Sequence, residues 1–344
     1  MKAVWKVLFL VTVCSQSLAI SEKNYKGDFQ TNVIPFTHSV GKFGSFTGIA
    51  HKKIAFSYYQ VNDEKGVIVM VPGRVEPMAK YAELIYDFAT QGYSVYIIDH
   101  RGQGNSQKLI ENKPELGHVE YFNDYVSDFK TFMEYFVNPV IDKQTKRRAH
   151  SKVYILAHSM GATIATLYLY DYHPDFVNAV VVSSPMFEMN MRGHPMYEVY
   201  GLLTKALVTD NLHEVVLNGK GYQWDYPFEG NDVTHSQARF QFEKDLVLLN
   251  PQFAVGDPTY KWLQTCLRAT SRVLRHGADL KYPILLFQAG QDSIVENGGQ
   301  EKFLAQNKSS RKIIFQTARH EILQETDDVR DRALVETLSF FASH

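Results

Sequence analysis

The sequence has 344 residues, with 36 Lys and Arg against 37 Asp and Glu and a formal net charge of −1 at pH 7. Hydrophobic residues make up 45% and charged residues 21%, which is typical of a globular protein with a large core. This length suits one large domain with an insertion, or two domains. The near-neutral charge argues against nucleic acid as a partner.

The N-terminal segment has the layout of a signal peptide. Lys2 and Lys6 accompany an apolar run over residues 7–13, and small residues follow up to Ala19. The run is much shorter than the roughly 20 residues that a membrane-spanning helix needs. We therefore expect residues 1–19 to be cleaved on export, giving a periplasmic or secreted protein, with membrane association as the alternative.

Short apolar runs bounded by Gly, Pro or polar residues predict buried strands, and stretches with helical apolar spacing lie between them. This alternation predicts an α/β fold, a mostly parallel central sheet with helices on both faces. Extended segments before Val61 are expected to add antiparallel edge strands. The predicted strands are Val67–Val71, Ser94–Asp99, Val153–Ala157, Ala179–Ser183, Ile284–Gln288 and Lys312–Gln316. The predicted helices are Met78–Thr90, Asn123–Phe136, Met160–Tyr172, Gln300–Gln306 and Val329–Ala342.

The alternation of strands and helices is interrupted over residues 186–276. This segment is rich in aromatic residues and contains the helix-compatible stretches Glu198–Leu207 and Tyr260–Leu274. An insertion of this length usually has its own structure and often acts as a lid. We predict that it forms a helical cap on a core made of residues 20–185 and 277–344.

Ser159 is the candidate nucleophile. It lies in the segment VYILAHSMG, after a predicted buried strand and before a predicted helix, which is the context of a nucleophile elbow. The sharp turn needs small neighbours, and here Ala157 stands where glycine is commonest, while Gly161 fills the second position. The motif alone leaves a helix N-cap serine as the alternative.

Asp292 and His320 follow in the chain order serine, acid, histidine, and each comes just after a predicted strand. Because the carboxyl ends of parallel strands share one edge of a sheet, the three residues are expected to converge. His320 would then take the proton of Ser159, and Asp292 would orient and stabilise the imidazole. Glu296 and Glu321 are nearby acids, but they fall inside predicted helix starts.

The segment VMVPGRVEP is the candidate oxyanion loop. Gly73 lets the backbone turn toward the site, so that the N–H groups of Arg74 and Met160 can stabilise a tetrahedral oxyanion. The Arg74 side chain suits a phosphate, and an acid of the cap or solvent are its alternative partners.

The stretch DHRGQGNS contains Asp99, His100 and Arg101, which we interpret as structural support for the oxyanion loop. His118 and His158 are given the same interpretation. No His, Cys or Asp cluster has zinc-site spacing, and no phosphate-binding or dinucleotide-binding glycine pattern follows a strand. The sequence therefore predicts neither a metal nor a cofactor.

Together the segments VPGRVEPMAKYAEL, IIDHRGQGNS, GHVEYFNDYVSDF, LAHSMGA, GQDSIV and ARHEI resemble bacterial lysophospholipases of the "L-two" type. These are close relatives of monoacylglycerol lipases among the α/β-hydrolases. The resemblance implies an α/β-hydrolase fold with a helical cap, a Ser159–Asp292–His320 triad, and backbone donors at Arg74 and Met160. It also implies hydrolysis of a single acyl ester in a lysophospholipid or monoacylglycerol. Separately, we expect any transient contact with a membrane surface to be made through apolar side chains of the cap.

The sequence departs from the family pattern at Ala162, where a second glycine is usual after Ser-Met-Gly, and in its signal peptide. A proline-type aminopeptidase on the same fold is an alternative, and it needs an acidic anchor for the substrate amine. The candidate anchors for the substrate amine are Glu188, Glu198, Glu214 and Glu229 of the cap. A non-catalytic binding protein is a further alternative.

Overall fold

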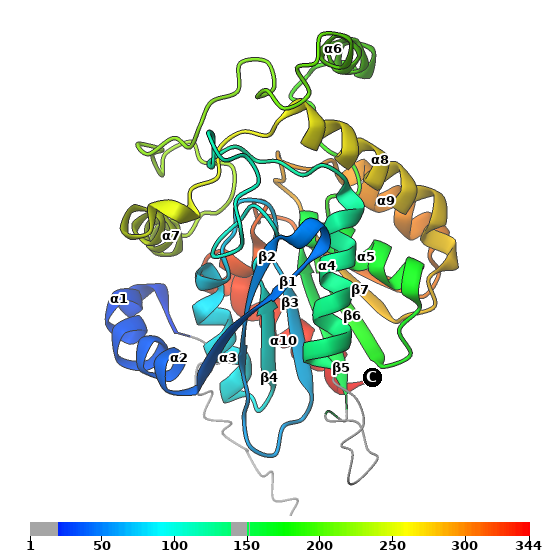
Figure 1. Cartoon of the computed structure of the whole chain (residues 1–344). Coiled ribbons are helices and arrows are strands. Elements are labelled where there is room, and N and C mark those ends of the chain that lie inside the picture. The colour runs from blue at the N-terminus through cyan, green and yellow to red at the C-terminus, as the bar shows by residue number, and fades with distance from the viewer. Residues whose placement is uncertain (1–19, 139–149, 151) are drawn as a thin grey trace, which may run out of the picture.

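The computed structural model describes residues 20–138, 150 and 152–344, so the predicted signal peptide lies outside the described residues. The centre of the molecule is an eight-stranded sheet in the order β1-β2-β4-β3-β5-β6-β7-β8 (Figure 1). The strands from β4 through β8 pair in parallel, whereas β2 pairs antiparallel with both β1 and β4. The strands are β1 (Gly41–Thr47), β2 (Lys53–Tyr59), β3 (Val67–Val71), β4 (Ser94–Ile98), β5 (Val153–His158), β6 (Val177–Ser183), β7 (Ile284–Ala289) and β8 (Ser310–Phe315).

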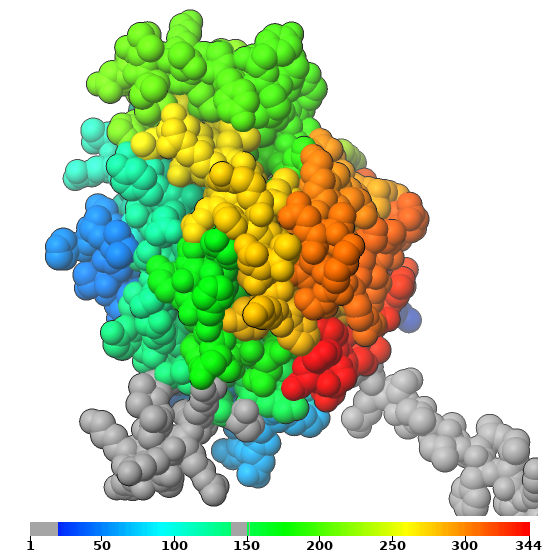
Figure 2. Space-filling view, turned by 90° about the vertical axis from the view of Figure 1, so that its right-hand side faces the viewer, coloured from blue at the N-terminus to red at the C-terminus, as the bar shows by residue number. Residues whose placement is uncertain are grey.

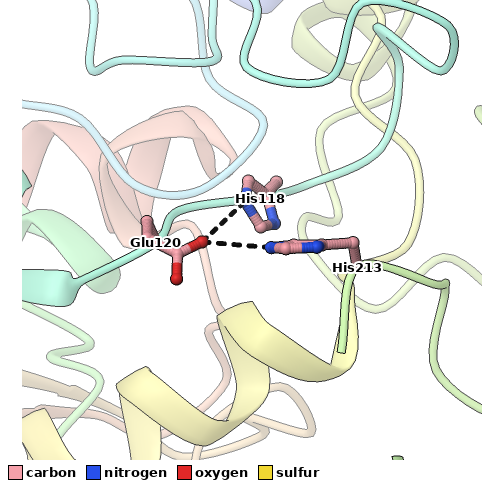
Figure 3. Close-up of side chains that lie close together, drawn as sticks. All are labelled: His118, Glu120 and His213. Carbon is pink, nitrogen blue, oxygen red and sulfur yellow. Dashed lines mark hydrogen bonds and ion pairs between the residues drawn. The ribbon is translucent and has the colours of Figure 1, made fainter. Parts of the chain in front are cut away.

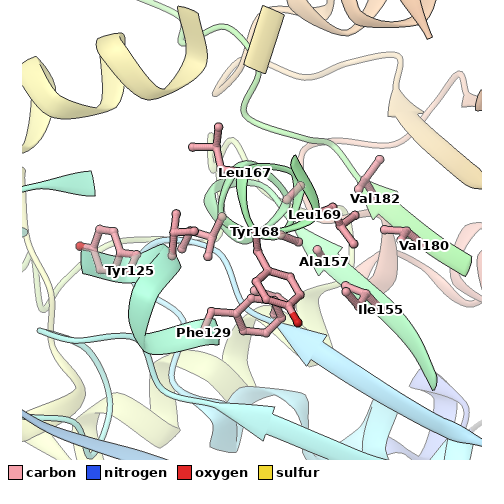
Figure 4. Packing of buried hydrophobic residues seen from close by; sticks show 14 of the residues in the cluster. Tyr125, Phe129, Ile155, Ala157, Leu167, Tyr168, Leu169, Val180 and Val182 are labelled. Carbon is pink, nitrogen blue, oxygen red and sulfur yellow. The ribbon is translucent and has the colours of Figure 1, made fainter. Parts of the chain in front are cut away.

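Helices cover both faces of this sheet. Along β5, Ile155 and Ala157 pack into the apolar cluster under α4 and α5 (Figure 4), whereas Tyr154 and Leu156 pack into the cluster under α3 and α10. Since both faces are buried, the inner strands are apolar throughout rather than alternating. The predicted fold is confirmed. The helices on the first face are α4 (Phe122–Phe132), α5 (Met160–Tyr172), α8 (Tyr260–His276) and α9 (Asn297–Gln306); those on the second are α3 (Ala82–Thr90) and α10 (Asp327–Ala342).

The N-terminal helices α1 (Tyr25–Asp28) and α2 (Ile34–Val40) are not predicted by the sequence. They are short, and short helices depend on tertiary packing rather than on intrinsic propensity. Here Phe29, between the two helices, packs on Phe242 of α7 with ring centroids 4.4 Å apart. The contact with a residue more than 200 positions away explains why local patterns did not reveal these helices.

The segment 186–276, predicted as the cap, contains α6 (Met196–Val208), α7 (Gln237–Leu249) and α8. In Figure 1, α6 is the outermost helix, whereas α8 lies along the core. Trp262 and Cys266 of α8 belong to the same buried cluster as the sheet, and Figure 2 shows α8 in yellow against the green α5 and orange α9. None of the described helices has the length and apolar character needed to cross a bilayer.

A buried charge network ties α7 to the core. Arg239 of α7 donates from Nη2 to Glu83 of α3 at 2.8 Å and to Asp327 of α10 at 3.0 Å. Arg330 of α10 pairs with Glu83 at 3.2 Å and also with Asp87. Because the Arg239, Arg330 and Glu83 side chains are buried, removal of one partner leaves another charge uncompensated, so the network fixes the position of α7 on the core.

Candidate active site

Ser159 lies in a sharp turn between β5 and α5. Its φ of 50° and ψ of −117° are strained for a residue other than glycine, as expected of a nucleophile elbow. A Cβ atom at Gly161 would overlap the carbonyl oxygen of Val71, so the second small position requires glycine. Ala157 is accommodated within the apolar core, which explains why alanine suffices at the first position.

The three residues predicted as a triad meet at the carboxyl edge of the sheet. His320 Nε2 lies 2.9 Å from Ser159 Oγ, and His320 Nδ1 lies 2.8 Å from Asp292 Oδ2. Since a carboxylate only accepts hydrogen bonds, Nδ1 carries the imidazole proton and Nε2 accepts from the serine hydroxyl. The residues follow β5, β7 and β8, so the parallel topology brings them together as the sequence predicts.

Further donors hold the Asp292 carboxylate. Its Oδ1 accepts from the backbone N–H groups of Ile294 at 2.9 Å and Val295 at 3.0 Å. Burial alone would raise the pKa of Asp292, but the hydrogen bond and charge of His320 and the two backbone donors lower it below its ordinary value. The carboxylate is therefore ionised at neutral pH and able to stabilise an imidazolium.

The loop after β3 runs alongside the elbow. A Cβ atom at Gly73 would lie 3.2 Å from Ser159 Cβ, which sets the loop beside the nucleophile. Gln103 donates to Gly73 O at 3.0 Å and accepts from Val75 N at 2.9 Å, so one side chain fixes the peptide groups on both sides of Arg74. Val75 has φ 64°, a strained conformation for a β-branched residue.

The DHRGQGNS stretch braces this loop. Asp99 Oδ1 accepts from Met78 N at 2.6 Å, and His100 Nε2 lies 3.0 Å from Pro72 O. Burial lowers the pKa of His100 to about 4, so the ring is neutral and donates its proton to that carbonyl. Arg101 pairs with acidic residues of α4. These contacts support the predicted structural interpretation of the stretch.

The Arg74 side chain is used within the protein. Its Nη2 donates to Gly256 O, and the guanidinium lies over the Trp262 ring at 5.3 Å from the centroid. Burial lowers the pKa of the Arg74 guanidinium, with nearby acidic groups opposing the shift. Of the alternatives that the sequence left open, an acid of the cap comes nearest, since Asp257 is the first of these opposing groups. The direct contacts of the side chain, however, are with Gly256 O and the Trp262 ring, so it bridges the oxyanion loop to the start of α8.

A charge cluster beside the site was missed by the sequence analysis. Lys80 Nζ lies 2.9 Å from Glu76, 2.8 Å from Glu243 of α7 and 2.6 Å from Glu321. Glu76 also accepts from Gly73 N, so the cluster joins α7, the oxyanion loop and the residue after the triad histidine. Burial would raise the pKa of Glu76, but Lys80 lowers it to about 2, whereas burial raises that of Glu321 to about 8. Only the four-residue spacing of Glu76 and Lys80 hinted at this pair.

The remaining acids and histidines near the site have other partners. Glu321, one alternative to Asp292, faces Lys80, and Glu296, the other, precedes α9. His158 lies with its ring 4.8 Å from that of His320, and burial lowers its pKa to about 4. A neutral His158 packs against the His320 ring without adding a positive charge beside it.

The strained serine turn, the mostly parallel sheet and the hydrogen-bonded chain from Asp292 to Ser159 define the protein as an α/β-hydrolase. The chain belongs to the Hydrolase_4 family, described as "Serine aminopeptidase, S33", whose model matches residues 62–327. Lysophospholipase L2 of Escherichia coli (strain K12) is 35% identical over 306 residues, covering 87% of each chain. The chain is thus a hydrolase of this lysophospholipase-like group, which confirms the resemblance seen in the sequence.

Further relatives extend the comparison. Probable lysophospholipase L2 of Haemophilus influenzae is 36% identical over 280 residues, covering 78% of this chain and 81% of that one. A soluble variant of monoglyceride lipase from Saccharomyces cerevisiae, crystallised with a substrate analog, has a TM-score of 0.69 and 16% identity. The superposition covers 89% of this chain and 95% of that chain, and it shows a shared fold.

Proposed function

We propose that this protein is a serine carboxylester hydrolase that releases fatty acid from lysophospholipids or monoacylglycerols. The observation that carries the proposal is the pair of hydrogen bonds that links Asp292 through His320 to Ser159. The names of the relatives supply the substrate class, and the chain matches the Escherichia coli lysophospholipase over 87% of its length.

The geometry supports a two-step acyl transfer. Ser159 Oγ attacks the ester carbonyl carbon while His320 Nε2 accepts its proton and Asp292 stabilises the imidazolium. The tetrahedral intermediate collapses, and the glycerol-side alcohol leaves with the proton from His320. Water then attacks the acyl-enzyme with His320 as the base, and the fatty acid leaves as Ser159 regains its proton.

The backbone N–H groups of Arg74 and Met160 are the proposed oxyanion donors. Met160 is the first residue of α5, so its N–H lies at the positive end of the helix dipole. The bracing of the Arg74 peptide by Gln103 fixes the second donor in advance of the reaction. Each such donor contributes about 3 kcal/mol to transition-state stabilisation.

Fatty-acid release measured with Ser159→Ala tests the mechanism. We expect the rate to fall by about 10⁶-fold, because the nucleophile is lost while the fold is retained. Ser271→Ala, at an exposed serine of α8, is the matched control and should retain full activity. A fluorophosphonate probe should label the native protein at Ser159, and its failure to do so would support a non-catalytic binding protein.

A lipid panel tests the substrate class. We expect one-chain lipids to be preferred over two-chain phospholipids, because the proposed cap (residues 186–276) narrows access to the site. Comparable rates on one-chain and two-chain lipids would contradict this preference.

The aminopeptidase alternative is tested with a proline arylamide. The family description names a serine aminopeptidase. Of the candidate amine anchors, however, Glu188 pairs with Lys302 at 2.7 Å and Glu214 pairs with Lys113 at 2.6 Å. Glu198 and Glu229 are exposed. Faster cleavage of the arylamide than of lysophosphatidylcholine would replace the lipid proposal.

We also propose that the cap contacts a lipid surface transiently, because it exposes large apolar side chains. Tyr197 is 75% exposed, Val208 79% and Leu249 81%. The export predicted from residues 1–19 is compatible with action at an envelope membrane. N-terminal sequencing of the protein recovered from the periplasm or medium should begin at Ile20, and an uncleaved cytoplasmic protein would overturn the predicted export.

A further inference from the structure

Three side chains from two distant segments of the sequence meet where the cap joins the core. His118 and Glu120 lie in the segment that leads into α4, and His213 lies in the loop after α6 (Figure 3). Their potential ligand atoms all lie within 4.8 Å of one another. Glu120 Oε2 lies 3.1 Å from His213 Nε2 and 3.7 Å from His118 Nε2.

We propose that His118, Glu120 and His213 form a Zn²⁺ site that clamps the cap to the core. Two imidazole nitrogens and one carboxylate oxygen are a donor set that binds Zn²⁺ with water as the fourth ligand. Tetrahedral bonds of 2.0–2.1 Å place neighbouring ligand atoms about 3.4 Å apart. The distances from Glu120 Oε2 to His213 Nε2, 3.1 Å, and to His118 Nε2, 3.7 Å, lie on either side of that separation.

The backbone around these ligands is fixed by hydrogen bonds to the start of α8. The carbonyl groups on both sides of His213 accept bonds: Leu212 O from Lys261 N at 2.7 Å, and Glu214 O from Tyr260 N at 3.0 Å. Gly117 O, next to His118, accepts from Thr259 N at 2.9 Å. One short segment therefore brings the core side and the cap side of the site together.

The side chains on the core side are also held by second partners. His118 Nδ1 lies 2.9 Å from Thr259 Oγ1, which leaves Nε2 for the ion, and Lys261 Nζ lies 2.9 Å from Glu120 Oε1, which leaves Oε2. Such outer contacts are what orient ligands in metal sites.

The two parts of the site differ in how far their side chains are buried. The side chain of His118 is buried, and Val119 between the two core ligands is anchored in the apolar cluster. The His213 side chain is 62% exposed, so it can turn toward the ion without repacking the interior. The proposed ion would therefore act mainly on the loop after α6, and so on the position of the outermost cap helix.

Zinc binding by the full chain, purified without a polyhistidine tag and stripped with a chelator, tests the proposal. We expect one tight Zn²⁺ equivalent in competition with a fluorescent chelator, and at least about a 100-fold loss of affinity in His213→Gln. Because His213 is exposed, this variant should fold; Glu120→Gln provides a second test. The matched control is His194→Gln, another exposed cap histidine beside a glutamate, Glu198 at 3.3 Å.

Stability and hydrogen exchange provide readouts that do not depend on hydrolysis. Stoichiometric Zn²⁺ should raise the Tm of the native chain and of His194→Gln but not that of His213→Gln. It should also slow amide exchange over residues 209–216. Unchanged affinity in both His213→Gln and Glu120→Gln, or equal loss in His194→Gln, would overturn the site. Tight binding without slower exchange in that loop would overturn the clamp.

Discussion

The catalytic edge of the sheet and the outer surface of the cap differ in how far their side chains are buried. Ser159 is 6% exposed and His320 is 4% exposed, and each has fixed partners. At the cap, Val208 and Leu249 end α6 and α7 with about four fifths of their surface exposed. Acyl-transfer chemistry needs groups fixed in advance, whereas contact with a lipid surface needs apolar area that no other part of the chain covers.

The largest expected effect is at the catalytic edge. Asp292→Asn preserves the size of the side chain but removes the charge and favours the wrong imidazole tautomer, so kcat should fall by about 10⁴-fold. The change should be measured as release of fatty acid at saturating substrate, with the Tm as a check on folding. A loss of less than tenfold would show that another group orients His320.

The Lys80 cluster, where the two regions meet, gives the second largest effect. Lys80→Met leaves three glutamates around one buried apolar side chain, so the free energy of unfolding should fall by about 3–5 kcal/mol. Denaturant unfolding measures this loss. Lys302→Met is the matched control, because Lys302 is 57% exposed and pairs with Glu188 alone among the acids of the described structure; it should cost less than about 1 kcal/mol. Similar losses in both variants would contradict a special role for the cluster.

The pH dependence of stability tests the same cluster more finely. Burial raises the folded-state pKa of Glu321 to about 8 from an ordinary value of 4.5, with Lys80 opposing. Between these values the folded protein binds a proton that the unfolded chain has released. Stability should therefore decrease as pH rises from 4.5 to 8, by at most about 1.4 kcal/mol per pH unit for this group.

The variant Glu321→Gln isolates this contribution. It should remove the decrease in stability between pH 4.5 and 8. It should leave the loss of stability at lower pH that accompanies protonation of Glu76, whose pKa is lowered to about 2. The free energy of unfolding of the two proteins is measured at several pH values. If it changes with pH in the same way for both proteins from pH 4.5 to 8, Glu321 is ionised throughout this range in the folded state.

The smallest effect is expected at the cap surface. Val208→Gln and Leu249→Gln should weaken binding to lysolipid-containing vesicles several-fold, because each removes part of the apolar area available to the membrane. Hydrolysis of a dissolved short-chain ester should not change. Tyr135→Gln, at a 68% exposed aromatic outside the cap, is the control. Equal weakening by all three variants would show that the cap has no special affinity for lipid.

Much of the catalytic edge could be predicted because the sequence patterns that specify it lie within short stretches of the chain. The buried run Val153–His158, followed by Ser159 and Gly161, specifies a strand, a tight turn and a helix within a short stretch. The helix was predicted with the bounds that the structure has, Met160–Tyr172. By contrast, the role of the Arg74 side chain depends on Gly256 and Trp262, which no local pattern connects to it.

The sequence by itself determined the class of fold and the three candidate catalytic residues, because parallel strands always present their carboxyl ends at one edge. Only the tertiary structure decided which charges meet between cap and core. Glu83 and Arg239 are 156 positions apart, and Glu120 and His213 are 93 positions apart. Such pairs carry no periodic signal, since an insertion is positioned by packing and hydrogen bonds against the core rather than by the propensities of its own residues.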